Sequence, residues 1–170
     1  MSHPLKYLSS YSPTIQAQCI KLLEADTLKR YLLNKYPTCH QFTTDKSLRK
    51  YVIELKNQFM KSTKPLSQIK YDDKIHIINN ALGLHSFVSK VQGSKIKGKN
   101  EIRVSSLFKK APEHFLKMIV VHELAHLKEK DHNKSFYKLC QHMQPDYHQI
   151  ELDLRLYLTQ LELKGSIYPL

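Results

Sequence analysis

The fold of this chain is decided by the stretch Ile119-Val120-Val121-His122-Glu123-Leu124-Ala125-His126, with His132 six residues further on. Residues four apart lie on one face of an α-helix, so His122 and His126 are expected to point at the same ion. Glu123 directly follows the first histidine and can reach a water molecule held by that ion. The pattern therefore predicts a helix that carries two metal ligands and a general base.

The helix that carries this motif is expected to begin at Pro112 and to be apolar on most sides. Its apolar residues are Phe115, Leu116, Met118, Ile119, Val120, Val121, Leu124, Ala125 and Leu127. A helix that is apolar all round is a buried helix. Two histidines and a glutamate in a buried helix need polar partners, because burying an unpaired polar group costs free energy. A bound metal ion with its water supplies such partners, which argues against a solvated helix that carries two histidines by chance.

A third metal ligand is expected after the end of this helix, where the chain can turn back. A catalytic zinc site uses three protein ligands and leaves one position for water. We expect His132 to be the third ligand, with His142, His148 and Glu151 as alternatives. The spacing equals that of the metzincins, which have glycine at the third position after the second histidine for a sharp turn. Glu129 stands at that position here, so the turn must be made in another way.

The N-terminal part of the chain predicts helices. Ser12-Pro13 is a typical helix start, and an apolar pattern at helical spacing continues from there to Leu33. Thr44-Asp45 offers a second cap, and an amphipathic stripe follows it to Phe59. Residues 1–64 are therefore predicted to form a helical N-terminal region.

The remaining residues, 65–170, predict a catalytic region with strands before the motif and helices after it. Short segments with strand-like patterns occur at residues 69–71, 75–78, 85–91 and 102–104. The first two flank Asp72-Asp73-Lys74, which predicts a hairpin. Further helices are expected from Asn133 or Ser135 to Met143, and from Ile150 to Leu163. The predicted fold class is α+β, with a small mixed sheet packed on the motif helix.

Composition places the chain among globular proteins. It has 170 residues, 41% of them apolar and 25% charged. No segment reaches the apolar length of a membrane span, and Met1–Tyr7 has no apolar run typical of a signal peptide. The three cysteines, Cys19, Cys39 and Cys140, form no C-x-x-C pair, so neither a disulfide framework nor a cysteine zinc site is expected. We expect a cytoplasmic location and no membrane contact.

The charge of the chain favours acidic partners. The formal net charge is +12, which suits nucleic acid, ribosomes or acidic proteins. Basic residues surround the predicted strand at 102–104, namely Lys90, Lys95, Lys97, Lys99, Arg103, Lys109 and Lys110. They are suited to phosphates, although the run lacks the interleaved aromatic residues of a single-strand stacking surface. A solvated loop is the simpler interpretation, with nucleic-acid contact as the alternative.

The motif predicts a hydrolytic mechanism. Zinc lowers the pKa of its water towards about 7 and polarises the scissile carbonyl, while Glu123 takes the proton and delivers it to the leaving amine. Tyr147 and Arg155 are candidate donors to the oxyanion, although packing and surface charge are commoner roles. Asp146 is a candidate for orienting a ligand histidine, although capping the last helix is commoner. A peptide substrate is expected to pair with residues 102–106 as an added strand.

Several stretches of the sequence resemble the YgjP-like metallopeptidase family of bacteria. The main one runs from Ile119 to Phe136 and contains the motif. Pro145-Asp146-Tyr147 is similar to the family's tail, and Ala111-Pro112-Glu113 to the start of its active helix. The resemblance covers the whole chain, including Tyr71–His76 and Asn80–His85.

This resemblance implies a minimal zincin-like metalloprotease core, a small sheet beside the active helix. It implies zinc on His122, His126 and His132, with Glu123 as the base. The family often has Trp-Gly-Ser before the last strand, where this chain has Val91-Gln92-Gly93-Ser94 and no tryptophan. The motif also looks like that of SprT/Spartan-type proteases, which cut proteins crosslinked to DNA. The resemblance does not give a substrate.

Three functions are compatible with the sequence. The first is a zinc-dependent peptidase acting on protein or peptide, including a role on DNA–protein crosslinks. The second is a zinc hydrolase of a non-peptide amide or another small substrate, which a closed pocket beside residues 102–106 would favour over an open groove. The third is a nucleic-acid-binding module with a structural zinc, held by a fourth ligand such as His142 or His148. Glu123 argues against the third, and Fe, Co, Ni or Mn are alternatives to zinc.

Overall fold

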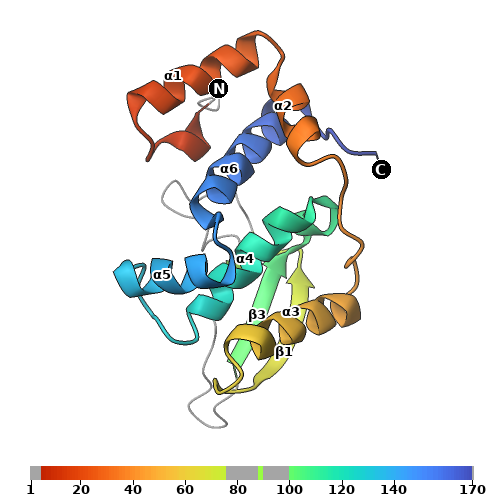
Figure 1. Cartoon of the computed structure of the whole chain (residues 1–170). Helices are drawn as coiled ribbons and strands as arrows, with labels where there is room; N and C mark the ends of the chain where they lie inside the picture. The colour runs from red at the N-terminus through yellow and green to blue at the C-terminus, as the bar shows by residue number, and fades with distance from the viewer. Residues whose placement is uncertain (1–4, 76–87, 90–99, 170) are drawn as a thin grey trace.

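In the computed structural model, the described residues are 5–75, 88–89 and 100–169. Their elements, in chain order, are η1 (Lys6–Leu8), α1 (Pro13–Glu24), α2 (Leu28–Lys35), α3 (Asp45–Phe59), β1 (Leu66–Asp72), β2 (Val88–Ser89), β3 (Asn100–Ser105), η3 (Ser106–Lys110), α4 (Glu113–Ala125), α5 (Lys134–Met143) and α6 (Tyr147–Lys164) (Figure 1). The predicted α+β class is confirmed. Within these ranges, no helix combines the length and apolar character that crossing a bilayer requires.

The sheet has the order β1-β3-β2, so β3 is its central strand. β1 runs parallel to β3, with Ile69 opposite Ile102 and Tyr71 opposite Val104. β2 runs antiparallel along the other side of β3, with Val88 opposite the same Val104. The predicted small mixed sheet is therefore confirmed.

Two strand predictions fall partly outside the described residues. Of the expected hairpin, 69–71 belongs to β1 and pairs with β3, while 76–78 lies outside the described ranges. The expected strand at 85–91 is described only at residues 88–89, as β2. Parallel pairing of β1 with β3 joins segments far apart in sequence, which local patterns cannot show.

The motif helix α4 lies at the centre of the molecule. From Phe115 to Ala125, every residue except Lys117 is buried. α4 contacts β3, α5 and α6, and Figure 1 shows it between the sheet and these two helices. A helix with apolar residues on every side gains most when it is covered on every side, as the sequence predicts here.

The helix α3 covers β1 and is fixed at its start by a capping box. The Oγ1 of Thr44 accepts from the backbone N–H of Ser47 at 3.1 Å, and the Oγ of Ser47 accepts from that of Thr44 at 3.0 Å. Its buried stripe includes Leu48 and Val52. The helix predicted after Thr44 is confirmed.

The expected continuous helix from Pro13 to Leu33 is wrong, because the chain breaks there into α1 and α2. Asp26 has φ 54°, the left-handed conformation that ends a helix and that aspartate tolerates better than most residues. The backbone N–H of Thr27 then bonds to the carbonyl of Leu22 at 2.9 Å and turns the chain. The last helix is confirmed, and it begins earlier than predicted, at Tyr147.

Candidate metal centre

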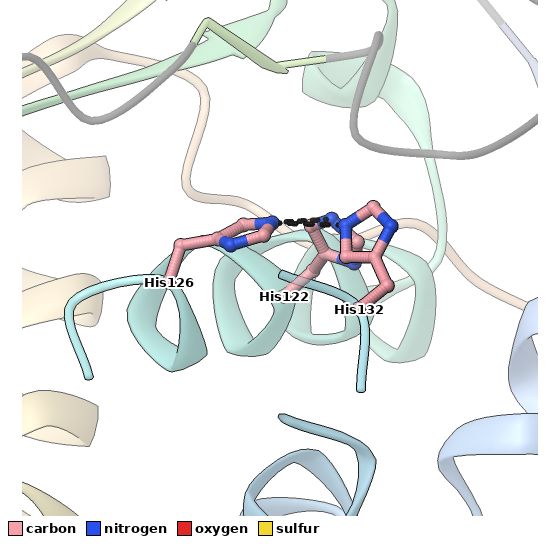
Figure 2. Close-up of side chains that lie close together, drawn as sticks. All are labelled: His122, His126 and His132. Atoms are coloured by element: carbon pink, nitrogen blue, oxygen red, sulfur yellow. Dashed lines mark hydrogen bonds between the residues drawn. The ribbon is translucent and has the colours of Figure 1, made fainter. Parts of the chain in front are cut away.

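The structure brings the three predicted histidines together. His122 lies on α4 and His126 caps its C-terminal end, while His132 comes from the loop that leads to α5. One nitrogen of each ring lies within 4.8 Å of the other two. Figure 2 shows the three rings with nitrogen atoms turned toward one another. This is the one group of potential metal ligands found in residues 5–75, 88–89 and 100–169.

The distances between the rings fit a tetrahedral metal site. The Nε2 of His126 lies 3.3 Å from the Nε2 of His122 and 3.0 Å from that of His132. Metal–nitrogen bonds of about 2.0–2.1 Å in tetrahedral geometry separate the ligand nitrogens by about 3.3 Å. Nitrogen atoms this close repel unless a proton or a cation lies between them. The three imidazoles therefore suit one shared cation.

The loop after α4 fixes His126 for this role. Its Nδ1 lies 3.0 Å from the backbone carbonyl of Glu129, which only accepts hydrogen bonds. The Nδ1 of a neutral His126 therefore carries the proton, and its Nε2 keeps a lone pair for a metal. The backbone N–H of Glu129 bonds in turn to the carbonyl of Ala125 at 2.9 Å. In the described ranges, Asp26 is the one non-glycine residue with positive φ, so the turn at Glu129 needs no glycine.

Behind His122 lies Tyr147, whose hydroxyl is 2.9 Å from the Nδ1 of that histidine. Tyr147 is fully buried, at the start of α6. This contact replaces the expected role of Tyr147 as an oxyanion donor, because the hydroxyl meets the nitrogen that faces away from the cluster. Sequence reasoning missed the contact, since it depends on how α6 packs against α4.

A second residue that sequence reasoning missed is Phe136, on α5. Its ring centroid lies 5.0 Å from that of His122, 4.6 Å from that of His126 and 4.9 Å from that of His132. In the sequence, Phe136 falls within the helix predicted to end at Met143, and nothing there indicates its contact with the histidines. One fully buried ring therefore supports all three imidazoles and limits their rotation.

Glu123, the predicted general base, directly follows His122 on α4 and is buried. The residue is 1% exposed, and its Oε2 has no hydrogen-bond partner among the described residues. Burial raises the pKa of this carboxyl well above its ordinary value. A buried carboxyl oxygen without a partner is costly unless a polar group meets it. A metal ion with its water is such a group, so the residues present fit the predicted metal.

The alternative third ligands lie in other environments. His142 packs its ring edge-on against Phe59, with centroids 5.4 Å apart. His148 packs against the ring of Tyr137 at 5.2 Å. Glu151 pairs with a guanidinium on its own helix. Of the four candidate third ligands, His132 is the one that lies in the cluster with His122 and His126.

The structure places Arg155 in a structural role. The Nη1 of Arg155 donates to the carbonyl of Tyr7 at 2.7 Å, and its Nη2 lies 3.5 Å from Glu151. The guanidinium thus joins α6 to the N-terminal segment, so the oxyanion role considered for it is not supported. Asp146 stands at the N-cap position of α6, but its side chain makes no capping hydrogen bond, so the capping role expected for it is not observed.

The structure describes the strand at 102–106, where a peptide substrate was expected to pair, and some of the basic residues around it. β2 pairs with β3 at Arg103 and Val104, so the expected added strand at 102–106 meets an occupied edge there. The Nε of Arg103 donates to a carboxylate oxygen of Glu101 at 2.8 Å, so the charge of Arg103 is already paired within the protein. Lys109 lies over the ring of Tyr71. The other basic positions up to Lys99 lie outside the described residues.

Comparison with known proteins identifies the family of this chain. The YgjP-like metallopeptidase domain matches residues 23–157. A protein of Escherichia coli (strain K12), named UTP pyrophosphatase, is 54% identical over 159 residues, which are 94% of this chain and 95% of that protein. No solved structure matches the chain. The matches indicate a metal-dependent hydrolase, and the chain belongs to the YgjP-like metallopeptidase family.

Proposed function

We propose that this protein is a zinc-dependent hydrolase that cleaves a nucleoside triphosphate such as UTP and releases pyrophosphate. The observation that carries the proposal is the 54% identity, over 94% of the chain, to a protein named UTP pyrophosphatase. The net charge of +12 supports it, because a triphosphate is a polyanion. This is the small-substrate alternative predicted from the sequence, with a phosphoanhydride in place of an amide.

The mechanism follows from the residues at the site. His122, His126 and His132 would hold the zinc, which when bound supplies a water of lowered pKa and an electrophile for negatively charged oxygen. Glu123 takes one proton from the attacking water. The water oxygen bonds to the α-phosphorus as the bond to the bridging oxygen breaks, and pyrophosphate leaves with the electron pair.

Peptide hydrolysis is the second candidate, favoured by the H-E-x-x-H motif and by the name of the matching domain. Glu123 would then deliver its proton to a leaving amine. The pairing of β2 with β3 counts against a peptide added directly to β3. Contact with nucleic acid, action on DNA–protein crosslinks and a cytoplasmic location stay predictions.

The test uses the full chain loaded with zinc. Metal content is measured by mass spectrometry, pyrophosphate release with UTP, and proteolysis with casein in the presence and absence of DNA. Glu123→Gln is expected to keep its zinc and to hydrolyse UTP about 10²–10⁴-fold more slowly, because the base is lost. His132→Ala is expected to lose the zinc. His142→Ala removes an exposed imidazole outside the cluster and is the matched control. It is expected to keep its zinc and to hydrolyse UTP at the rate of the wild type.

The outcomes separate the candidates. Pyrophosphate release from UTP without casein cleavage supports the nucleotide substrate. Casein cleavage without hydrolysis of UTP contradicts the nucleotide substrate and supports the peptidase. Stimulation of that cleavage by DNA would indicate a role on DNA–protein crosslinks. Zinc that survives in His132→Ala contradicts the proposed set of ligands.

A further inference from the structure

We propose that Tyr147 is a positioning residue of the metal centre: its hydroxyl accepts the Nδ1–H of His122 and donates its own hydrogen to the sulfur of Cys140. This relay fixes the tautomer of His122 that presents a lone pair on Nε2. The inference rests on the proposed metal function and adds a side chain to the machinery that holds the ion.

The position of Tyr147 leaves it little freedom. The side chain is 0% exposed on the first turn of α6, and it reaches across to α4, where its hydroxyl meets the Nδ1 of His122 at 2.9 Å. Its ring also packs 6.3 Å from that of Tyr137 and 5.5 Å from that of His148. A hydroxyl in such a buried site needs hydrogen-bond partners, because burying it unpaired costs free energy.

The direction of the relay follows from the tautomer of the histidine. The Nε2 of His122 faces the Nε2 of His126 at 3.3 Å, so it is the nitrogen available to the shared ion. A neutral imidazole carries one N–H, which must then be on Nδ1. The Nδ1 of His122 therefore donates and the oxygen of Tyr147 accepts.

The hydrogen of the Tyr147 hydroxyl goes to Cys140. Both side chains are buried, and we assign the sulfur of Cys140 as the acceptor because the two groups influence each other's pKa as a donor and an acceptor do. Burial raises the pKa of the Cys140 thiol to about 12 and raises that of Tyr147 well above its ordinary value. Both groups are therefore neutral at physiological pH, and the sulfur serves as a weak acceptor.

A neutral relay has a consequence for the charge of the site. Ligand histidines commonly donate their second N–H to a carboxylate or a backbone carbonyl. His126 uses the carbonyl of Glu129, and His122 uses a tyrosine. Neither partner brings a negative charge, so neither reduces the attraction of the centre for an anionic substrate such as a triphosphate.

Tyr147→Phe tests the inference, because it keeps the ring and removes the hydroxyl. The affinity for zinc, measured by competition with a chromophoric chelator, is expected to fall about 10–100-fold. Tyr168→Phe is the matched control, since it removes a buried hydroxyl that donates to the carbonyl of Tyr36 at 2.6 Å. The control is expected to lose stability in urea and to keep the zinc affinity of the wild type.

Two further measurements separate positioning from simple packing. In zinc-loaded wild type, nitrogen NMR of the imidazoles is expected to show His122 protonated on Nδ1, with a hydrogen-bonded signal that moves in Tyr147→Phe. Cys140→Ser keeps an acceptor for the relay and is expected to bind zinc as the wild type does, whereas Cys140→Ala binds it less tightly.

If Tyr147→Phe binds zinc as tightly as Tyr168→Phe, the proposed positioning role is contradicted and Tyr147 is a packing residue only. A wild-type chain that binds no zinc overturns the metal-dependent function as well, and this failure is visible without any variant. Tight zinc binding without hydrolysis of UTP leaves the relay standing and contradicts only the proposed substrate.

Discussion

At the scale of single residues, His40 shows how burial fixes a protonation state outside the metal centre. This side chain is 8% exposed, in the segment between α2 and α3. Its Nε2 donates to the carbonyl of Phe108 at 2.5 Å, and its Nδ1 accepts from the backbone N–H of Phe42 at 2.9 Å. The neutral ring thus makes a hydrogen bond with each of its nitrogens. A second proton, on Nδ1, would break the bond from the backbone N–H of Phe42.

A dependence of stability on pH follows from this arrangement. Burial lowers the pKa of His40 below its ordinary 6.5. Below pH 6.5 the unfolded chain therefore binds a proton that the folded chain refuses, so this part of the stability is complete above pH 6.5 and is lost as the pH falls. His40→Asn keeps an acceptor for Phe42 and does not titrate, but it loses the bond to Phe108.

We expect wild type to be more stable than His40→Asn by about 1–2 kcal/mol near pH 8, with the difference shrinking towards pH 5. Urea unfolding of the two proteins across this range checks it. Other groups that titrate cancel in the difference, so a gap that does not change with pH would contradict the neutral, buried state of His40.

The residues of the site divide by how local their signal is. His122, Glu123 and His126 are predicted by a five-residue pattern, because helix geometry alone brings them to one face. His132 is predicted because a short loop limits where it can go. The partners Tyr147 and Phe136 come from α6 and α5, and their contacts depend on packing that no local pattern contains.

At the scale of elements, the start of α5 controls the loop that carries His132. The Oδ1 of Asn133 accepts from the backbone N–H of Phe136 at 2.9 Å and so caps the helix. The backbone N–H of Asn133 donates to the carbonyl of Asp131 at 2.8 Å. Asn133 therefore both caps α5 and bonds to Asp131, so the residues on either side of His132 are fixed relative to each other.

We expect Asn133→Ala to lower the free energy of unfolding by about 1 kcal/mol, the usual cost of losing an N-cap, and to weaken zinc binding. Thr44→Ala is the matched control, because it removes the cap of α3, away from the cluster. Unfolding in urea and chelator competition measure the two effects. Equal zinc affinities in both variants would show that the cap of α5 does not hold the loop.

The sequence predicted most of the helices and the presence of a small mixed sheet, but it did not predict which strands of that sheet pair. The helices α3, α4 and α5 each have a start signal and an apolar pattern within one short segment. The break at Asp26 was missed because the apolar spacing continues across it. The pairing of β1 with β3 was missed because it joins segments that are far apart in the sequence, and a local pattern contains no information on such pairing.

At the scale of the whole molecule, α6 joins the helical N-terminal region to the residues around the metal centre. Asp153 on α6 is 0% exposed, and its Oδ1 accepts from the hydroxyl of Tyr31 at 2.8 Å. Its Oδ2 accepts from the hydroxyl of Tyr36 at 2.5 Å and pairs with the Nζ of Lys35 at 2.7 Å. One buried carboxylate thus collects three donors from α2 and its C-cap.

Because residues before and after the predicted boundary at 64 and 65 share this carboxylate, we expect the chain to unfold in one transition. Asp153→Ala removes the acceptor of the buried Tyr36 hydroxyl and of the partly buried Tyr31 hydroxyl, so the free energy of unfolding should fall by about 2–5 kcal/mol. Calorimetry and urea unfolding followed by tyrosine fluorescence measure this effect. Asp26→Asn is the control, because it removes an exposed ion pair with Lys164 and should change nothing measurable. Two separate transitions in Asp153→Ala, with the later one unshifted, would instead show that residues 65–170 form an independent folding unit.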